Sequence, residues 1–342
     1  TTIIVTFVYG AFFTSVIASD ENTGTLFWTW GIASTAIIVS ILSPILGALA
    51  DKGGFRKFFL ILFTWICAIF SILLYFPQSG DVFFALSLFV IANISFELGS
   101  VFCNSYLQDL SEDSNIGKIS GFAWGLGFVG GLLALFISFS LFELNSVGIR
   151  GINILVGVWF LIFSIPTFLF VKDRKKDKLT KKHFVDSFDS IKTTFKEVVK
   201  YKIIMKFLIA RLFFNDGLIT IFSLGGIYAV DTLDFTFDEV MMLGIVLNIS
   251  AAIGSFVFGY LEDKIGVKKV INISLVVLVF STLLAFIAPY FKFQKEIFWI
   301  AGVLIGLMVG PNQSCSRSLM AKLTPKEKQN EFFGFFALTG KA

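Results

Sequence analysis

Residues 47–57 read GALADKGGFRK, and residues 259–269 read GYLEDKIGVKK. Both stretches share the pattern Gly-x-Leu-x-Asp-Lys-x-Gly followed by a basic pair, and the second begins 212 residues after the first. Further matches follow at an offset of 213 and set Ser105, Leu110, Gly121 and Phe122 against Ser318, Leu323, Gly334 and Phe335. An internal repeat of this length predicts two related bundles of six helices each.

The composition places these helices in a membrane. Hydrophobic residues make up 56% of the 342 residues and charged residues 15%, whereas about a quarter of a soluble domain is charged. Apolar runs of about 20 residues, the length that crosses a bilayer, recur along the whole chain. They lie near 1–18, 26–50, 56–76, 82–107, 119–142, 150–171, 203–229, 236–260, 267–289 and 296–320, and an eleventh begins near 332. The sequence therefore predicts an all-α membrane protein with a 6+6 helix architecture.

The repeat also predicts the domain organisation. We expect an N-terminal bundle at 1–171, a cytoplasmic linker at 172–202 and a C-terminal bundle at 203–342. At the repeat offset, the head of span one falls before Thr1 and span twelve after Ala342, so about ten to eleven of twelve helices are expected here. Apolar residues recur at helical spacing in the linker, which predicts either an amphipathic helix on the membrane face or a plain linker helix.

The loop charges predict the orientation. Counted by alternate loops, one side of the membrane carries 23 Lys and Arg residues and the other side three. The positive-inside rule places the basic side, with the linker, in the cytoplasm. We therefore expect an integral protein of a bacterial-type cytoplasmic membrane, or of a vacuolar membrane if the source is eukaryotic. Juxtamembrane lysines account for the basic loops without a nucleic-acid partner.

The sequence lacks the residues that a metal site or a redox centre in the membrane would need. His183, in the linker, is the one histidine of the chain, so an intramembrane haem or zinc centre held by histidines is excluded. Cys67, Cys103 and Cys315 fall inside apolar spans, where free cysteine packs as a small apolar residue. Nothing resembles a nucleotide-binding loop or a nucleophile–histidine pair, so no catalytic residue, metal or cofactor is predicted.

The loop at 47–57 resembles the Gly-x-Leu-Ala-Asp-x-x-Gly-x-Arg-Lys motif of the major facilitator superfamily, and 259–269 is similar to its second-half copy. Other stretches resemble the vacuole-effluxer-like family within that superfamily. They are SPILGA at 43–48, NISFE at 93–97, FNDG at 214–217, SRSL at 316–319 and EFFGF at 331–335. The resemblance runs through essentially the whole chain and implies a secondary transporter. Fungal members of that family are thought to release amino acids from the vacuole.

The resemblance implies a gating role for the motif loop. Asp51 lies at a cytoplasmic helix end, and Arg56 and Lys57 begin the next helix. A carboxylate there can accept hydrogen bonds from the N-terminus of a neighbouring helix and pair with Arg56, with Asp109 as a second partner for Arg56. Such a cluster would latch the outward-facing state; the alternative is a static staple of the loop. The residues assigned to the gate are Gly47, Asp51, Gly54, Arg56, Lys57, Asp109, Asp263 and Arg317.

The span at 82–107 carries a polar stripe. Its five polar residues recur at steps of four, three, four and four, which places them on one face of a helix. They are Asn93, Glu97, Ser100, Asn104 and Gln108. Glu97 lies well inside the span, where an ionisable group costs roughly 2.5–3.5 kcal/mol. We predict that Glu97 binds substrate or a coupling proton; the alternative is a buried structural partner for Arg211.

Two later spans hold the remaining polar candidates. Arg211, Asn215 and Asp216 lie in the span at 203–229, where Gly217 and the glycine pair at 225–226 favour a locally irregular helix. Arg211 and Asp216 either bind the carboxylate and amine of a zwitterion or neutralise each other or neighbouring helices. In the span at 296–320, the sequence Gly-Pro-Asn-Gln at 310–313 is expected to interrupt the helix beside a binding cavity.

The sequence thus predicts a monomeric secondary transporter of a small polar metabolite in a lipid bilayer, with amino acids first among the substrates and a proton as the coupling ion. The residues assigned to the substrate and proton pathway are Asn93, Glu97, Asn104, Arg211, Asn215, Asp216, Asn312 and Gln313. The alternatives are a sugar or organic-anion permease of the same fold and a non-transporting membrane sensor or scaffold. A scaffold would not need an intramembrane carboxylate.

Overall fold

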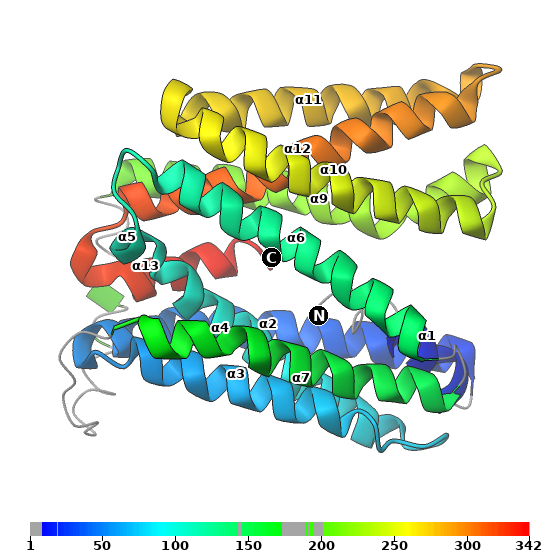
Figure 1. Ribbon diagram of the computed structural model, residues 1–342, viewed down its shortest axis with the longest axis horizontal. Helices are drawn as coiled ribbons and strands as arrows, with labels where there is room; N and C mark the ends of the chain where they lie inside the picture. The colour runs from blue at the N-terminus through cyan, green and yellow to red at the C-terminus, as the bar shows by residue number, and fades with distance from the viewer. Residues whose placement is uncertain are drawn as a thin grey trace. The chain divides into compact units, whose positions relative to one another are not determined.

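The computed structural model describes residues 9–18, 20–142, 146–172, 189, 192–193 and 201–341 (Figure 1). The long helices are α2 (Glu21–Gly53), α3 (Arg56–Leu73), α4 (Val82–Ser105), α6 (Ile116–Leu141), α7 (Ser146–Phe170), α9 (Lys202–Leu233), α10 (Phe237–Ile265), α11 (Val267–Ile287) and α12 (Gln294–Leu323). The shorter ones are α1 (Gly10–Phe12), η2 (Phe13–Ile17), α5 (Leu107–Leu110), η3 (Ala288–Tyr290), η4 (Lys326–Lys328) and α13 (Gln329–Leu338). The expected linker helix and the first half of span one lie outside the described residues.

Within the described ranges, nine helices are long and apolar enough to cross a membrane. They correspond one by one to the nine predicted spans from 26–50 to 296–320. The all-α membrane class predicted from the apolar runs is therefore confirmed. Of span one, the described part forms α1 and η2.

The chain divides into two compact units. The first comprises Thr1–Ser105, Leu133–Lys202 and Pro325–Ala342, and the second comprises Tyr106–Leu132 and Ile203–Thr324. Each unit therefore includes a segment from the other half of the sequence: α13 belongs to the first unit, and the beginning of α6 to the second. The expected bundle limits at 171 and 203 stay a prediction.

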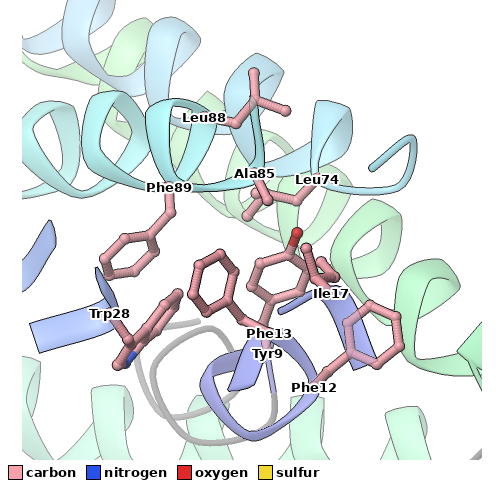
Figure 2. Packing of buried hydrophobic residues seen from close by; sticks show 9 residues of the cluster. All are labelled: Tyr9, Phe12, Phe13, Ile17, Trp28, Leu74, Ala85, Leu88 and Phe89. Atoms are coloured by element: carbon pink, nitrogen blue, oxygen red, sulfur yellow. The ribbon is translucent and has the colours of Figure 1, made fainter. Parts of the chain in front are cut away.

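In the first unit, α3 packs against α4 and α7, and α2 packs against α4 and α13. Figure 1 shows α3 and α7 running side by side. An aromatic cluster joins α2 and α4 to the end of span one, and the ring centroids of Trp28 and Phe89 lie 4.1 Å apart. Its members, drawn in Figure 2, are Tyr9, Phe12, Phe13, Ile17, Trp28, Leu74, Ala85, Leu88 and Phe89. Burial of these large rings fixes one end of the unit.

In the second unit, α12 packs against α10 and α11. Glycines allow α10 and α12 to approach closely: a Cβ added to Gly306 would lie 2.7 Å from the Leu247 carbonyl oxygen, and one added to Gly254 would collide with the Leu307 carbonyl. Small residues at such crossings bring helix backbones into van der Waals contact, which is a main source of helix association in lipid.

We expect Gly254→Ala to lower the melting temperature of the purified full-length protein, because forcing a methyl into a packed crossing costs about 1–3 kcal/mol. Gly244, on the same helix, is the matched control, since a Cβ there meets nothing within 4 Å. Gly244→Ala should leave the melting temperature unchanged or raise it, because alanine favours the helix over glycine by about 0.5–1 kcal/mol. Equal melting temperatures for the two variants would contradict the assigned crossing.

Two shared residues of the repeat fix the helix ends. Gly54 ends α2 with φ 67°, and Gly266 ends α10 with φ 93°. Both angles lie in the left-handed region that glycine adopts without a Cβ clash. The glycine that both motif copies share therefore turns the chain between two antiparallel helices. At its other end α2 is capped by Asp20, which accepts from the Thr23 N–H at 2.9 Å, and the Thr23 hydrogen bonds hold the pKa of this carboxyl below its usual value.

Two expected helix breaks are wrong. The helix α9 is continuous from Lys202 to Leu233, through Gly217 and the glycine pair at 225–226. The helix α12 is likewise continuous from Gln294 to Leu323, with Pro311 inside it. A glycine costs a helix only about 1 kcal/mol, whereas unpaired backbone groups in lipid cost several, so the regular hydrogen-bond pattern prevails. Pro311 removes one bond to the Leu307 carbonyl, which packs against Gly254.

Candidate functional site

Asp51, near the end of α2, binds the N-terminus of α13. Its Oδ1 accepts hydrogen bonds from the Asn330 N–H at 3.1 Å and from Asn330 Nδ2 at 2.7 Å, and its Oδ2 accepts from the Glu331 N–H at 2.8 Å. The first N–H groups of a helix have no partner within it and carry partial positive charge, so a carboxylate satisfies both needs. Each charge-assisted bond contributes about 1.5–3 kcal/mol. The Asp51 carboxylate therefore ties α2 to α13.

Arg56 reinforces the same junction without touching Asp51. The guanidinium is buried, and its Nη1 donates to the Ser105 carbonyl at 3.2 Å and to Gln329 Oε1 at 2.9 Å. Ser105 Oγ in turn donates to Asn330 Oδ1 at 2.6 Å. The expected direct pair between Asp51 and Arg56 is wrong: each side chain binds the start of α13 instead.

Two other gate residues have defined places. Lys57 donates to the Val171 carbonyl at 2.7 Å, just beyond the end of α7, where a cation complements the free carbonyls of a helix C-terminus. Asp109 lies on α5, in the second unit. Its assignment as a partner of Arg56 stays a prediction.

Gly47 explains why α13 can approach α2. A Cβ added to Gly47 would lie 2.9 Å from the Glu331 Cα and closer still to the Asn330 backbone. From the opposite side, a Cβ on Gly334 would lie 2.7 Å from the Pro44 Cα. Glycine at both positions brings the α13 N–H groups within reach of the Asp51 carboxylate.

The second copy of the motif repeats this arrangement in the second unit. Asp263, near the end of α10, accepts from the Gly117 and Lys118 N–H groups at 2.8 Å each. Both N–H groups lie in the first turn of α6, which begins at Ile116. A Cβ on Gly259 would lie 2.7 Å from the Gly121 Cα. The repeated sequence therefore encodes a repeated contact, in which a carboxylate binds a helix N-terminus over a pair of glycines.

Glu262, beside Asp263, is a buried acidic residue that the sequence analysis missed. Ser318 Oγ lies 2.7 and 2.8 Å from its two oxygens, and Lys322 Nζ lies 3.9 Å away. Arg317, assigned to the gate, donates from Nη2 to the Ser120 carbonyl at 2.8 Å. The first copy of the motif has alanine at the position of Glu262, and this difference is the signal that could have identified it.

The predicted polar stripe exists on one side of α4. All five of its residues are half-buried, unlike the fully buried Leu98 and Phe102 on the opposite side. Gln108, just past the end of α4, donates to the Thr324 carbonyl at 3.1 Å. The helical spacing read from the sequence thus separates a polar face from a packed apolar one.

Glu97 forms an ion pair with Lys341. Lys341 Nζ donates to Glu97 Oε1 at 2.6 Å, and the two side chains are 18% and 30% exposed, in the order Glu97 and Lys341. Glu97 lies about 20 Å along the helix from Leu110, the end of its candidate membrane span, and Lys341 follows the last residue of α13, Leu338. The pair therefore lies well inside an apolar layer about 30 Å thick. Removing one partner of a fully buried pair costs about 3–5 kcal/mol, and partial exposure lowers that figure here.

Lys341 is the second residue that the sequence analysis missed. The partner that the structure gives to Glu97 is this lysine, whereas the sequence suggested Arg211. Of the 28 Lys and Arg residues, Arg211 and Lys341 are the two that the alternate-loop count leaves inside spans. A lysine nine residues into the apolar run that starts near Phe332 was the available signal.

The polar residues of α9 and α12 form two separate contacts. Gln313 Nε2 donates to Asn215 Oδ1 at 3.1 Å, and Asn312 Nδ2 donates to Ser274 Oγ at 3.1 Å. Arg211 is buried with 6% exposure, whereas Asp216 is exposed. Five residues apart on a continuous helix, these two side chains lie about 140° apart around the axis. The structure therefore does not bring the Arg211 guanidinium and the Asp216 carboxylate together, as either a neutralising pair or a joint site would require.

Comparison with known proteins extends these observations. The family described as "vacuole effluxer Atg22 like" matches residues 25–342. An uncharacterized MFS-type transporter of Bacillus subtilis is 27% identical over 99% of this chain and 81% of its own length. Autophagy-related protein 22 of Coccidioides immitis is 22% identical over 95% of this chain and 67% of its own length. The solved structure of the proton:xylose symporter XylE matches with a TM-score of 0.74 at 14% identity, over 99% of this chain and 82% of that one. The fold is that of the major facilitator superfamily.

Proposed function

Because the chain belongs to the vacuole effluxer Atg22-like family, we propose that it is a secondary active transporter that moves a small polar metabolite across a membrane by alternating access. Its preferred substrates are amino acids, and a proton is the coupling ion. The protein works as a monomer in the cytoplasmic membrane of a bacterium, or in a vacuolar membrane if the source is eukaryotic. It moves its substrate unchanged and uses no cofactor.

The observation that carries this proposal is the charged and polar face of α4. A helix surrounded by lipid or by apolar helices gains nothing from five half-buried polar residues, and an ionisable group at that depth is costly. Such residues mark solute and ion pathways in membrane proteins. The Glu97–Lys341 ion pair keeps two charges beside this face, with Nζ and Oε1 2.6 Å apart.

The two carboxylate contacts support the alternating-access part of the proposal. Asp51 binds the α13 N-terminus and Asp263 binds the α6 N-terminus through hydrogen bonds alone. Such contacts can open and re-form without chemical change, and packed helices favour discrete arrangements over continuous deformation. This supports a gating role for the motif loops, in which each carboxylate favours one arrangement.

The proposal is tested by flux measurements on the full-length protein in proteoliposomes. Amino acids, hexoses and organic anions are offered in turn, with and without an imposed pH gradient, and uptake and efflux are followed by mass spectrometry. We expect gradient-dependent accumulation of amino acids that a protonophore abolishes and that empty liposomes lack. Accumulation of hexoses or of organic anions without an amino group would favour the permease alternative. Absence of any flux would favour a sensor or scaffold.

The orientation is tested by labelling a Lys178→Cys variant in a background that lacks the native cysteines. The 23-to-three charge split predicts that this position is cytoplasmic. In intact cells we therefore expect an impermeant maleimide to leave it unlabelled until the membrane is permeabilised. The matched control is Asn22→Cys, which lies near the start of α2 and is exposed. Equal labelling of both variants in intact cells would contradict the predicted orientation.

A further inference from the structure

Lys341 differs from the other basic residue inside the spans. The Arg211 side chain is enclosed, with the whole residue 6% exposed, whereas the Lys341 side chain keeps 30% of its surface exposed. Lys341 follows the end of α13 at Leu338 and faces α4 through Glu97. The Lys341 ammonium group therefore lies next to the polar face of α4, where it pairs with a carboxylate inside the span Val82–Leu110.

We infer that Lys341 binds the carboxylate of the transported solute, and that Glu97 holds Lys341 while the site is empty. This inference rests on the proposed transport function and narrows it to solutes that carry a carboxylate. Amino acids meet that requirement, whereas neutral sugars do not.

The hydrogen-bonding capacity of the pair supports this assignment. An ammonium group has three donors, and within the described residues Lys341 Nζ uses one of them, for Glu97 Oε1. Two donors remain for an incoming carboxylate. Lysine carries its charge at the end of a flexible four-carbon chain, so Nζ can turn from Glu97 to a solute without movement of the backbone.

Among the described residues, the helices that pack against α4 are α2, α3, α13 and η2. The helix η2 carries no charged residue, and the charged residues of the other three lie in their first or last turns. The titratable side chain at mid-length is the Cys67 thiol of α3, which is buried. A solute carboxylate that binds beside the polar face of α4 can therefore pair with the Lys341 ammonium group.

The exchange of partners also accounts for the coupling proton. When a solute carboxylate takes Lys341, Glu97 loses its counter-ion in an apolar surrounding, and it binds a proton. In the loaded site the solute carboxylate neutralises Lys341 and the proton neutralises Glu97, and the α-ammonium group of an amino acid adds one positive charge. When the solute leaves, the proton leaves Glu97, and the Glu97–Lys341 pair re-forms.

The test compares carboxylates with their amides in the full-length protein. Counterflow into proteoliposomes is measured for each L-amino acid, for its α-amide, which lacks the carboxylate, and for hexoses. The decisive variant is the double substitution Glu97→Gln with Lys341→Met, because it removes both charges and leaves neither partner unpaired. The control is Glu239→Gln with Lys295→Met, which removes another ion pair, with N–O distance 2.8 Å and side chains each 35% exposed.

We expect the wild type and the control to prefer amino acids over their amides by about tenfold or more, the size of effect that one charge-assisted contact gives, and the double variant to lose that preference. If the double variant keeps it, the pair is structural and the inference is wrong. If the wild type moves hexoses or amides but no carboxylate, the inference is wrong while the proposed transport function stands. Absence of flux for every solute would overturn both.

Discussion

Replacement of Asp51 by asparagine is expected to lower the transport rate by roughly tenfold or more, with substrate affinity unchanged within a few-fold. The carboxylate accepts three hydrogen bonds from the first turn of α13. An asparagine keeps one acceptor, loses the charge and directs an NH₂ group at an N–H donor. Loss of about 1.5–3 kcal/mol from one arrangement shifts the balance between states by roughly ten- to hundredfold. The substitution leaves the residues assigned to substrate binding unchanged, so we expect the same dissociation constant for the substrate within a few-fold.

The measurement is the exchange rate in proteoliposomes beside equilibrium binding by the same preparation. Asp263→Asn should act in the same direction, because Asp263 caps α6 as Asp51 caps α13. Asp113→Asn is the control, since Asp113 is exposed in the loop just before α6. A large loss of binding with normal exchange kinetics would show that Asp51 belongs to the substrate site and that the gating assignment is wrong.

Replacement of Glu97 by glutamine is expected to abolish accumulation driven by a pH gradient while substrate exchange continues within about tenfold of wild type. A glutamine cannot take up or release a proton, so the solute would move without its coupling ion. The Lys341 ammonium remains available for the solute, and exchange needs no net proton movement. A change of hydration between two facing states is what allows a buried carboxylate to bind a proton in one and release it in the other.

The measurement is the accumulation ratio of an amino acid with and without the gradient, beside counterflow in its absence. Glu296→Gln, an exposed carboxylate near the start of α12, serves as the control and should accumulate substrate as the wild type does. If Glu97→Gln keeps full pH-dependent accumulation, Glu97 is structural. The proton site would then be sought at Asp216, the exposed carboxylate of α9.

Features that depend on nearby residues could be predicted from the sequence. Nine of the predicted apolar runs form helices long enough to cross a membrane in the described residues, because a helix in lipid must satisfy its backbone within itself. The spacing of Asn93, Glu97 and Asn104 placed them on one face, because the helical period is fixed. The sequence analysis expected the carboxylate at the end of α2 to bind a helix N-terminus, and Asp51 does so.

Contacts between residues that are far apart along the chain could not be predicted. Lys341 lies 244 residues from Glu97 along the chain, and no local pattern joins them. Asp51 and Arg56 were expected to pair because both belong to the motif loop, yet both bind α13. The breaks expected in α9 and α12 were wrong because glycine and proline preferences are weak beside the cost of an open backbone in lipid.

The contact between α2 and α13 has a consequence for biosynthesis. Asn330 follows Asp51 by 279 residues, and ribosomes add roughly 5–20 residues per second, so α2 is made roughly 15–55 s before the helix that covers its glycine face. During that interval the newly inserted α2 presents Gly47 and the Asp51 carboxylate without the donors of α13. Other partners, such as lipid headgroups, water or the insertion machinery, must occupy them meanwhile. A chain stalled before Asn330 leaves that face uncovered, and we expect membrane quality-control proteases to remove such chains faster than chains stalled after Leu338.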